Sequence, residues 1–345
     1  MTAGRGTSAG AAGGPVRHHP VMLREVLSCL ALKDGGIYLD GTFGAGGHTR
    51  AILAAANCKV IGLDRDRGAI ATGAGLIESS DGRLMLAEER FSRLDQIARD
   101  LGHQRLDGVL LDLGVSSMQL DLPERGFSFR HDGPLDMRME RNGPSAADIV
   151  REWPETELAR VFATLGEERR ARAVARAIVE SRKERPIERT GELAEIVRAV
   201  VRGKPGEIDP ATRSFQALRL MVNDELNELA RALLAAERIL APGGRLVVIA
   251  FHSLEDRIVK TFLAARGRTI SPSRHRPESS ALAPTFRLLT KKPVVPSADE
   301  VAENPRARSA KLRAAERSDK AARDDDPAAA LLARYPSLER ASRRR

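Results

Sequence analysis

The residues best suited to hold a ligand form a glycine-rich run, Asp40-Gly41-Thr42-Phe43-Gly44-Ala45-Gly46-Gly47-His48. This run follows the short apolar segment 36–40, which predicts a strand, and precedes a predicted helix over 49–56. Glycine lets the backbone turn sharply and approach a ligand where a Cβ would clash. Free amides at the start of a helix can then receive a carboxylate or a phosphate. The run therefore predicts a cofactor loop between a strand and a helix, although a tight turn without a ligand stays open.

Two common nucleotide-binding patterns do not match this loop. A P-loop ends in Gly-Lys-Ser/Thr, whereas this chain has Gly47-His48-Thr49. A dinucleotide fingerprint needs a third glycine, and Thr49 stands at that position. The acidic residue directly ahead of the loop, Asp40, agrees better with the pattern of S-adenosylmethionine-dependent methyltransferases.

Acidic residues also end two further predicted strands. Asp64 ends the segment 59–64, where a carboxylate can accept hydrogen bonds from both hydroxyls of a ribose. Asp112 ends the segment 106–112 and would lie on the same carboxyl edge of the sheet. Phe91, in a connection between strands, is placed to flank an adenine ring. Helix capping by Asp64 and core packing by Phe91 are the alternatives that the sequence leaves open.

These residues need a sheet to bring them together. Continuous apolar segments at 36–40, 59–64, 106–112 and 244–250, separated by helices, predict an α/β fold with a doubly wound, mostly parallel, Rossmann-like sheet. Between them, segments 155–165, 167–182 and 190–201 predict helices only. The predicted organisation is a disordered leader over 1–16, a methyltransferase domain over 17–122 and 223–317, and a disordered tail over 318–345. Residues 123–222 would form an all-helical insertion that recognises the substrate.

Composition narrows the class of protein. The 56 Lys and Arg residues against 47 Asp and Glu give a net charge of +9, which favours a polyanionic partner or reflects solubilisation by arginine. The two cysteines, Cys29 and Cys58, have no His or Cys at ligand spacing, so neither a disulfide scaffold nor a metal site is predicted. No apolar run approaches the ~20 residues of a membrane span, and no signal peptide is recognisable. The expectation is a soluble cytoplasmic protein without membrane contact.

Longer motifs resemble one known family. They are His18-His19-Pro20-Val21-Met22-Leu23, the glycine run itself, Gly62-Leu63-Asp64-Arg65-Asp66, segments 111–120, 125–129 and 133–139, Ala211-Thr212-Arg213-Ser214-Phe215-Gln216-Ala217-Leu218-Arg219, segment 251–260 and segment 303–309. In this order, over about Arg17 to Arg317, they are similar to the ribosomal RNA small subunit methyltransferase H family, which methylates cytosine N4 in bacterial 16S rRNA.

The resemblance implies a cofactor and a substrate. The cofactor would be S-adenosylmethionine, with contacts at Gly46, Gly47, His48, Asp64, Phe91, Asp112 and Gln119; His48 and Gln119 come from the resemblance alone. The substrate would be a cytidine in the decoding region of 16S rRNA, in the small ribosomal subunit. The family's fold is a methyltransferase domain interrupted by a helical domain. The sequence leaves open whether the protein forms a homodimer.

An exocyclic amine needs no cysteine adduct, but an acceptor near the amine helps to localise its lone pair. Asp112 is the best candidate for this catalytic role, although holding the cofactor's amino group is the alternative. Weaker candidates are Asp136, His252 and Glu255. The side chains expected to meet RNA are Arg138, Arg141, Arg213 and Arg219 on phosphates, and Phe127, Phe129 or Phe215 stacked on a splayed base.

Two competing functions remain at this stage. The first is methylation of another RNA base or of a protein side chain. The second is a non-catalytic, nucleotide-binding assembly factor. Cofactor binding separates the second from an enzyme.

Overall fold

The structure is a computed structural model that describes residues 20–203, 208–269 and 283–338. It contains a seven-stranded sheet with the order β3-β2-β1-β4-β5-β7-β6. The strands are β1 (Ile37–Asp40), β2 (Lys59–Asp64), β3 (Leu84–Glu88), β4 (Leu106–Asp112), β5 (Leu240–Ala250), β6 (Phe286–Leu288) and β7 (Lys311–Arg317). Strands β1 to β5 are parallel, and β7 is antiparallel to both β5 and β6. The predicted α/β fold with a mostly parallel sheet is therefore confirmed.

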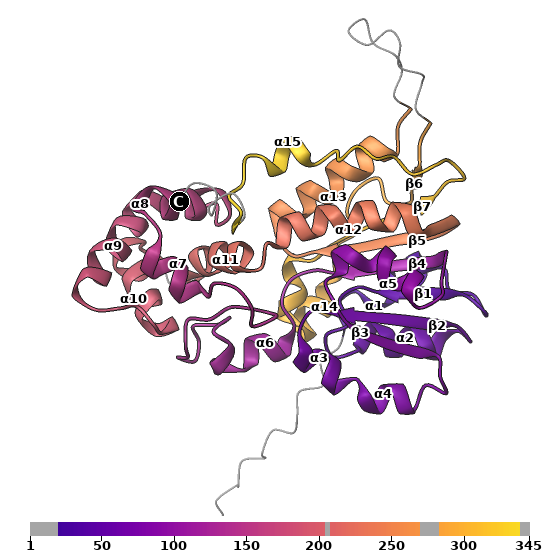
Figure 1. The fold of residues 1–345 in the computed structure, drawn as a ribbon, viewed down its shortest axis with the longest axis horizontal. Helices are drawn as coiled ribbons and strands as arrows, with labels where there is room; N and C mark the ends of the chain where they lie inside the picture. Colours follow the sequence, from indigo (N-terminus) through magenta and orange to yellow (C-terminus); the bar gives the residue numbers. More distant parts are fainter. Residues whose placement is uncertain (1–19, 204–207, 270–282, 339–345) are drawn as a thin grey trace, which may run out of the picture.

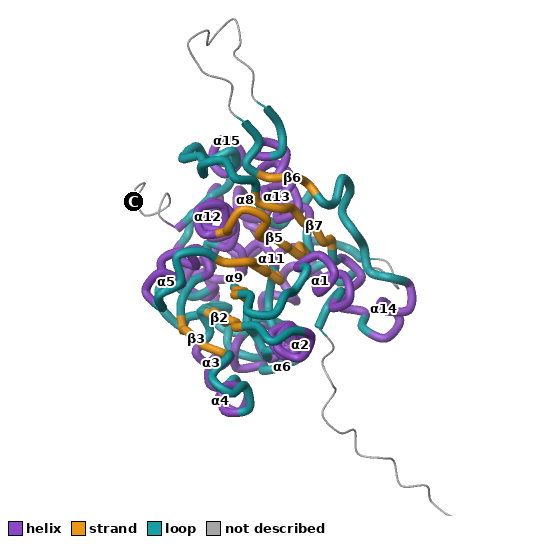
Figure 2. The backbone as a smooth tube through the Cα atoms, turned by 90° about the vertical axis from the view of Figure 1, so that its right-hand side faces the viewer, coloured by secondary structure: helices purple, strands orange, loops and turns teal. Residues whose placement is uncertain are grey.

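Helices cover both faces of this sheet. Successive strand residues point to opposite faces, so Tyr38 and Val60 pack in one core while Leu39 and Ile61 pack in the other. Figure 2 shows α1 and α2 on one side of the row of strands, with α5 and α12 on the other. The helices around the sheet are α1 (Leu23–Leu30), α2 (Gly47–Ala55), α3 (Arg67–Thr72), α4 (Ala74–Glu78), α5 (Leu94–Asp100), α12 (Glu225–Ile239), α13 (Ser253–Arg266) and α14 (Ala298–Glu303).

A group of helices between β4 and β5 forms a separate lobe beside the sheet (Figure 1). It comprises α7 (Ala146–Glu152), α8 (Glu155–Thr164), α9 (Ala171–Glu184), α10 (Thr190–Val200) and α11 (Ala211–Val222), and α6 (Ser117–Asp121) leads towards it. Helix α9 begins four residues later than its predicted start at 167. The cause is local, because Glu167 has a left-handed φ of 49°, which interrupts a helix.

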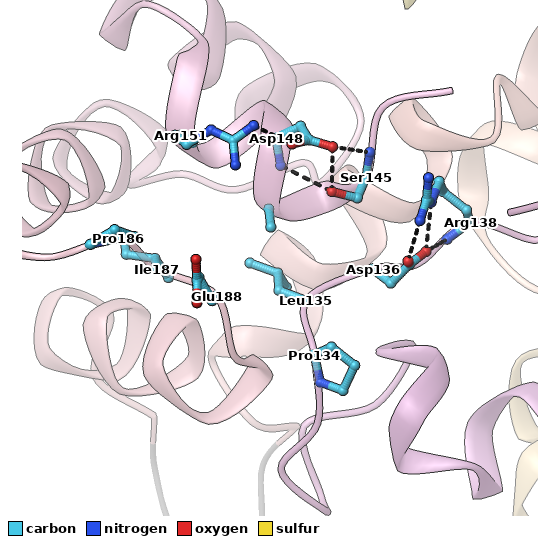
Figure 3. A pocket seen from close by; sticks show the side chains of 11 residues that line it. Pro134, Leu135, Asp136, Arg138, Ser145, Asp148, Arg151, Pro186, Ile187 and Glu188 are labelled. Atoms are coloured by element: carbon cyan, nitrogen blue, oxygen red, sulfur yellow. Dashed lines mark hydrogen bonds and ion pairs between the residues drawn. The ribbon is translucent and has the colours of Figure 1, made fainter. Parts of the chain in front are cut away.

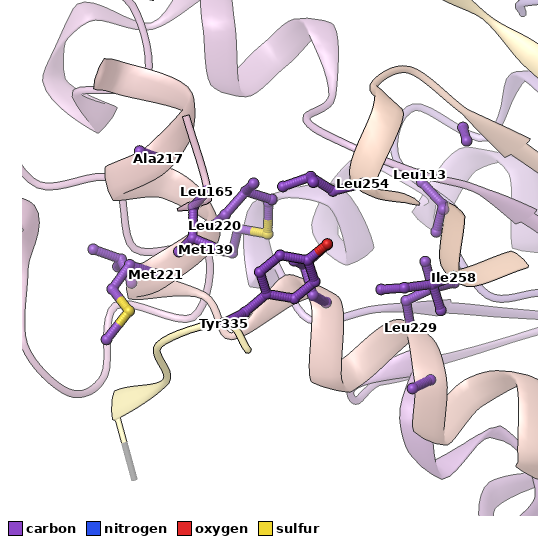
Figure 4. Packing of buried hydrophobic residues seen from close by; sticks show 14 of the residues in the cluster. Leu113, Met139, Leu165, Ala217, Leu220, Met221, Leu229, Leu254, Ile258 and Tyr335 are labelled. Atoms are coloured by element: carbon purple, nitrogen blue, oxygen red, sulfur yellow. The ribbon is translucent and has the colours of Figure 1, made fainter. Parts of the chain in front are cut away.

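The prediction of a disordered tail over 318–345 is wrong for residues 318–338. Arg323 and Tyr335 are buried, and the short helix α15 (Ala329–Leu332) lies between them. Figure 4 shows Tyr335 among Leu220 of α11, Leu229 of α12 and Ile258 of α13. The charged composition of the tail suggested solvent, but the tail packs against the core, and its Asp325 pairs with the buried Arg266. The leader 1–16 and residues 339–345 lie outside the described residues.

A buried ion pair shows why the tail packs here. Arg266 and Glu237 are both 0% exposed, and Arg266 Nε donates a hydrogen bond of 2.7 Å to Glu237 Oε2. The second edge of the guanidinium donates to both carboxylate oxygens of Asp325, at 3.1 Å. A fully buried guanidinium needs such partners because its desolvation is costly.

We expect Glu237→Gln to lower the free energy of unfolding by about 2–3 kcal/mol, because it removes the charge that compensates Arg266. Urea denaturation measures this change. The control is Glu180→Gln, because the exposed pair of Glu180 with Lys183 should contribute less than about 0.5 kcal/mol. Equal effects of the two variants would contradict the role given to the buried pair.

Candidate active site

The first four strands of the sheet all end in a carboxylate. Asp40 ends β1, Asp64 ends β2, Glu88 ends β3 and Asp112 ends β4. Because these strands are parallel, the four carboxylates lie along one edge of the sheet. Asp40 is buried and accepts hydrogen bonds from Thr49 Oγ1 at 2.8 Å and Thr42 N at 3.2 Å. Asp40 therefore shapes the loop that follows it.

The glycine loop joins β1 to α2 with two residues in left-handed conformations, Gly44 at φ 54° and Gly46 at φ 72°. A Cβ on Gly46 would lie 2.7 Å from Cζ of Phe43, and one on Gly47 would lie 2.8 Å from Cγ of Pro20. Neither position can take a larger residue without displacing its neighbours. Helix α2 begins at Gly47 without a side-chain cap, so its first amides face the loop.

Asp64 orients towards this loop from the end of β2. Its Oδ2 accepts a hydrogen bond of 2.8 Å from Gly44 N, and its Oδ1 accepts one of 2.8 Å from Asp66 N. Burial raises the pKa of Asp64 to about 6, against the lowering effect of these two amides. The alternative of capping the next helix belongs to Asp66, whose side chain accepts from Gly68 N. Each Asp64 oxygen keeps a lone pair for a further donor.

Asp112 and His48 face each other across the β1–β4 edge. His48 Nδ1 lies 3.6 Å from Asp112 Oδ2, and His48 Nε2 lies 3.0 Å from the carbonyl oxygen of Val21. A carbonyl oxygen only accepts, so Nε2 carries the hydrogen in this contact. The other carboxylate oxygen, Asp112 Oδ1, is buried and has no hydrogen-bond partner among the described residues. Burial raises the pKa of Asp112 to about 6, and the nearby carboxylates of Asp40 and Glu255 add to this increase against the opposing effect of His48.

Phe91 and Gln119 occupy different settings. Phe91 is half-buried in the connection that follows β3, and its Cβ lies 3.2 Å from the position a Cβ on Gly41 would take. It therefore borders the glycine loop as well as the core. Gln119 is buried, with Nε2 donating to Asp66 Oδ2 at 2.8 Å and Oε1 accepting from Ser116 N at 3.0 Å. Gln119 therefore ties the loop after β4 to the loop after β2.

Sequence reasoning missed the groups that hold the helical lobe against this edge. Glu140 Oε1 accepts hydrogen bonds from Arg65 Nε at 2.6 Å and Arg90 Nε at 2.7 Å, and these arginines follow β2 and β3. Asn223, at the end of the lobe, accepts from Arg65 Nη1 through its carbonyl oxygen at 2.8 Å. On the β5 side, Glu167 Oε2 accepts from Ser253 Oγ at 2.7 Å. The lobe is thus anchored on both sides of Asp112.

The sequence matches the family model of the MraW methylase family over residues 15–318. The chain belongs to the MraW methylase family. It is 63% identical over 345 residues to the ribosomal RNA small subunit methyltransferase H of Azorhizobium caulinodans, with all of both chains covered. It is 60% identical to the protein of that name from Xanthobacter autotrophicus over 346 residues, again with all of both chains covered.

These comparisons confirm the family that the motifs indicated. They also confirm the predicted class, a methyltransferase, and with it the cofactor S-adenosylmethionine. The donor groups fit that cofactor, because the site offers free helix amides for a carboxylate, Asp64 for hydroxyls and an unpaired buried oxygen of Asp112 for a cationic or amine donor. Within the three described ranges, no helix of this methylase is long and apolar enough to cross a membrane.

The aromatic residues expected to stack on a base are mostly unavailable in this methylase. Phe127 and Phe215 are 7% and 4% exposed, so the prediction that either stacks on a base is wrong. Both belong to the core that joins the lobe to the sheet. Phe129 is only half-buried, but it packs edge-on against Phe215 and beneath the guanidinium of Arg198. The spacing of aromatic residues in the sequence cannot distinguish one that stacks on a base from one that packs in the core.

The arginines expected to meet phosphates fall into two groups. Arg138 pairs with Asp136 at 2.7 Å, and Arg219 pairs with Glu225 at 3.0 Å, so both are already neutralised. Arg141 and Arg213 are exposed and have no ion pair among the described residues. The weaker catalytic candidates are also engaged. Asp136 holds Arg138, whereas Glu255 accepts from Phe251 N and forms the cap of α13 with His252.

A hollow of ≈ 220 Å³ lies within the lobe rather than at the strand ends (Figure 3). Two of its three carboxylates are paired, Asp136 with Arg138 and Asp148 with Ser145 and Arg151, and the third, that of Glu188, belongs to an exposed residue. The carboxyl edge of the sheet therefore remains the candidate site.

Proposed function

We propose that this methylase transfers a methyl group from S-adenosylmethionine to the N4 amine of a cytidine in the decoding region of bacterial 16S rRNA. The observation that carries the proposal is the buried, unpaired Oδ1 of Asp112 at the end of β4. An unpaired buried carboxylate oxygen is costly, and a donor supplied by a substrate or cofactor relieves that cost. The relatives' name, ribosomal RNA small subunit methyltransferase H, supports RNA of the small subunit as the substrate.

The cysteine positions favour an amine over a ring carbon. Methylation at pyrimidine C5 uses a cysteine that attacks the ring, and that cysteine must reach the carboxyl edge. Cys58 is buried directly before β2, at the opposite edge of the sheet, and Cys29 lies within α1. Burial raises the pKa of both thiols, which keeps them protonated and unreactive. An exocyclic amine needs no such nucleophile.

The proposed cofactor contacts are Gly46, Gly47, His48, Asp64, Phe91, Asp112 and Gln119. The bound cofactor supplies an electrophilic methyl group on a sulfonium. The loop amides and Asp64 would fix its carboxylate and ribose, while Phe91 would border its adenine. Asp112 Oδ1 would accept the proton that the amine nitrogen loses when it takes the methyl group, while the sulfur would keep the electron pair of the broken carbon–sulfur bond. His48, held by Val21, would keep the carboxylate in place.

The test of this function is the nucleoside content of 16S rRNA from cells that lack the gene, measured by mass spectrometry. We expect N4-methylcytidine to be absent there and to return when the wild-type gene is supplied. The gene with Asp112→Asn, expressed to the same level, should restore little of it. If the strain without the gene kept its N4-methylcytidine, the proposed substrate would be rejected. If it lost a different methylated nucleoside instead, that nucleoside would be the product.

A further inference from the structure

Four exposed arginines gather where α8 turns into α9. Arg169 and Arg170 lie in the turn, Arg172 lies in the first turn of α9, and Arg213 lies in the first turn of α11. We call them the turn arginines. Arg213 Nη1 lies 3.5 Å from the carbonyl oxygen of Glu167, which brings α11 and the turn together. Arg170 donates to the carbonyl oxygen of Val200 at 2.5 Å.

The turn arginines have no carboxylate partner among the described residues, unlike several other arginines of the lobe. Arg138, Arg189, Arg198 and Arg219 each pair with an acid at 3.0 Å or less. An arginine without a counter-charge leaves a positive potential at the surface. Four of them in one place form a concentrated site for a polyanion.

Helix stability does not explain this placement. The start of a helix is positive, so acids there stabilise it and arginines do not. Helices α7, α8 and α10 follow this rule, with Asp148, Glu155 and Glu192 in their first turns. Helices α9 and α11 have no acid in the first turn and carry turn arginines there instead. The charges add to the positive helix ends rather than offsetting them.

Glu167 holds this positive surface next to the carboxyl edge of the sheet. Its carboxylate accepts a hydrogen bond of 2.7 Å from Ser253 Oγ and lies 3.5 Å from Arg257 Nη2. Ser253 is the first residue of α13 and follows the carboxyl end of β5. Strand β5 pairs with β4 so that Ile249 lies opposite Asp112. The turn arginines are therefore anchored on the β5 side of the proposed methyl-transfer position.

We propose that the turn arginines bind the phosphates of the RNA strand next to the target nucleotide. This inference rests on the proposed function and adds the surface that holds the substrate. Guanidinium groups contact phosphates without reading sequence, which positions a strand while other groups select the base. A base that leaves its stack to reach Asp112 carries its neighbouring phosphates along the protein surface. The surface that carries the turn arginines lies on the β5 side of Asp112, where it would receive them.

The test compares the wild-type protein with the triple variant R169Q/R172Q/R213Q. The probe is a fluorescent in vitro transcript of the 3′ part of 16S rRNA, and the measurement is its affinity over a range of salt concentrations. We expect affinity to fall about 10- to 100-fold and the salt slope to decrease by about 2–3, because each phosphate contact releases about one counterion. The control is R105Q. Arg105 is an exposed arginine ahead of β4, at the opposite edge of the sheet, so this variant should change neither the RNA affinity nor the salt slope.

Methyl transfer to undermethylated small subunits separates this inference from the proposed function. The triple variant should raise the KM for the subunit while kcat and S-adenosylmethionine affinity stay within about twofold. If the triple variant kept the RNA affinity and the salt slope of the wild-type protein, the proposed RNA-binding surface would be rejected. The proposed function would still stand. A wild-type protein that binds RNA through these arginines but forms no N4-methylcytidine would overturn the function alone. If the wild-type protein did not bind the transcript or the subunit, the surface would be rejected.

Discussion

Replacing Asp64 by alanine is expected to weaken S-adenosylmethionine binding at least about 100-fold, because two hydrogen bonds from ribose hydroxyls to a carboxylate contribute about 1.5–3 kcal/mol each. The side chain also organises the site before the cofactor arrives, since it accepts from Gly44 N of the loop and from Asp66 N. Removing this carboxylate therefore affects both the hydrogen bonds to the ribose and the conformation of the glycine loop. Isothermal titration calorimetry of purified protein measures the change.

Two variants make this result specific. Asp64→Asn keeps one acceptor oxygen, so it should lose less affinity than alanine does. Asp107→Ala changes a carboxylate at the opposite end of the sheet, where it accepts from Ile37 N and pairs with Lys33, and should leave cofactor affinity unchanged. Near-normal affinity of Asp64→Ala would remove Asp64 from the site. Lost affinity in Asp107→Ala as well would mean that general destabilisation explains the effect.

The sheet could be predicted because the sequence of its strands has a clear local pattern. Strands β2 and β4 are apolar runs that end in an acid, and such runs are typical of strands covered on both faces. The carboxyl ends of parallel strands lie at one edge of the sheet, so the sequence alone predicts that Asp64 and Asp112 lie there together. The helical lobe followed from its amphipathic periods, apart from the start of α9, which the left-handed Glu167 delays.

What sequence could not predict depends on partners far apart in the chain. The tail was misread because Asp325 pairs with Arg266, and Tyr335 packs in the core and accepts from Arg257, and no local pattern records those contacts. Glu140 was missed for the same reason, since its partners Arg65 and Arg90 are 75 and 50 positions away. The spacing of Phe127 and Phe215 said nothing about whether solvent reaches them. The unpaired Oδ1 of Asp112 is likewise visible only when every neighbour is in place.

Replacing Asp112 by asparagine is expected to lower kcat for methyl transfer about 10²- to 10⁴-fold, the range typical of a lost general base. An amide oxygen can still accept a hydrogen bond from the amine, but it cannot take the proton. The matched control is Asp136→Asn, because Asp136 is occupied by Arg138 and should leave kcat within about threefold. Initial rates with saturating cofactor and undermethylated small subunits measure both.

The dependence on pH gives an independent check of the same carboxylate. Burial raises the pKa of Asp112 to about 6, and only the ionised form accepts a proton, so the rate should be constant above this pH and fall about tenfold for each unit below it. Asp64 has a pKa of about 6 as well, so the profile must be recorded with the cofactor saturating. If Asp112→Asn lost cofactor affinity but kept kcat and its pH profile, Asp112 would hold the cofactor's amino group instead. If kcat fell and affinity stayed, the carboxylate acts on the amine, because only the reaction step would have lost its proton acceptor.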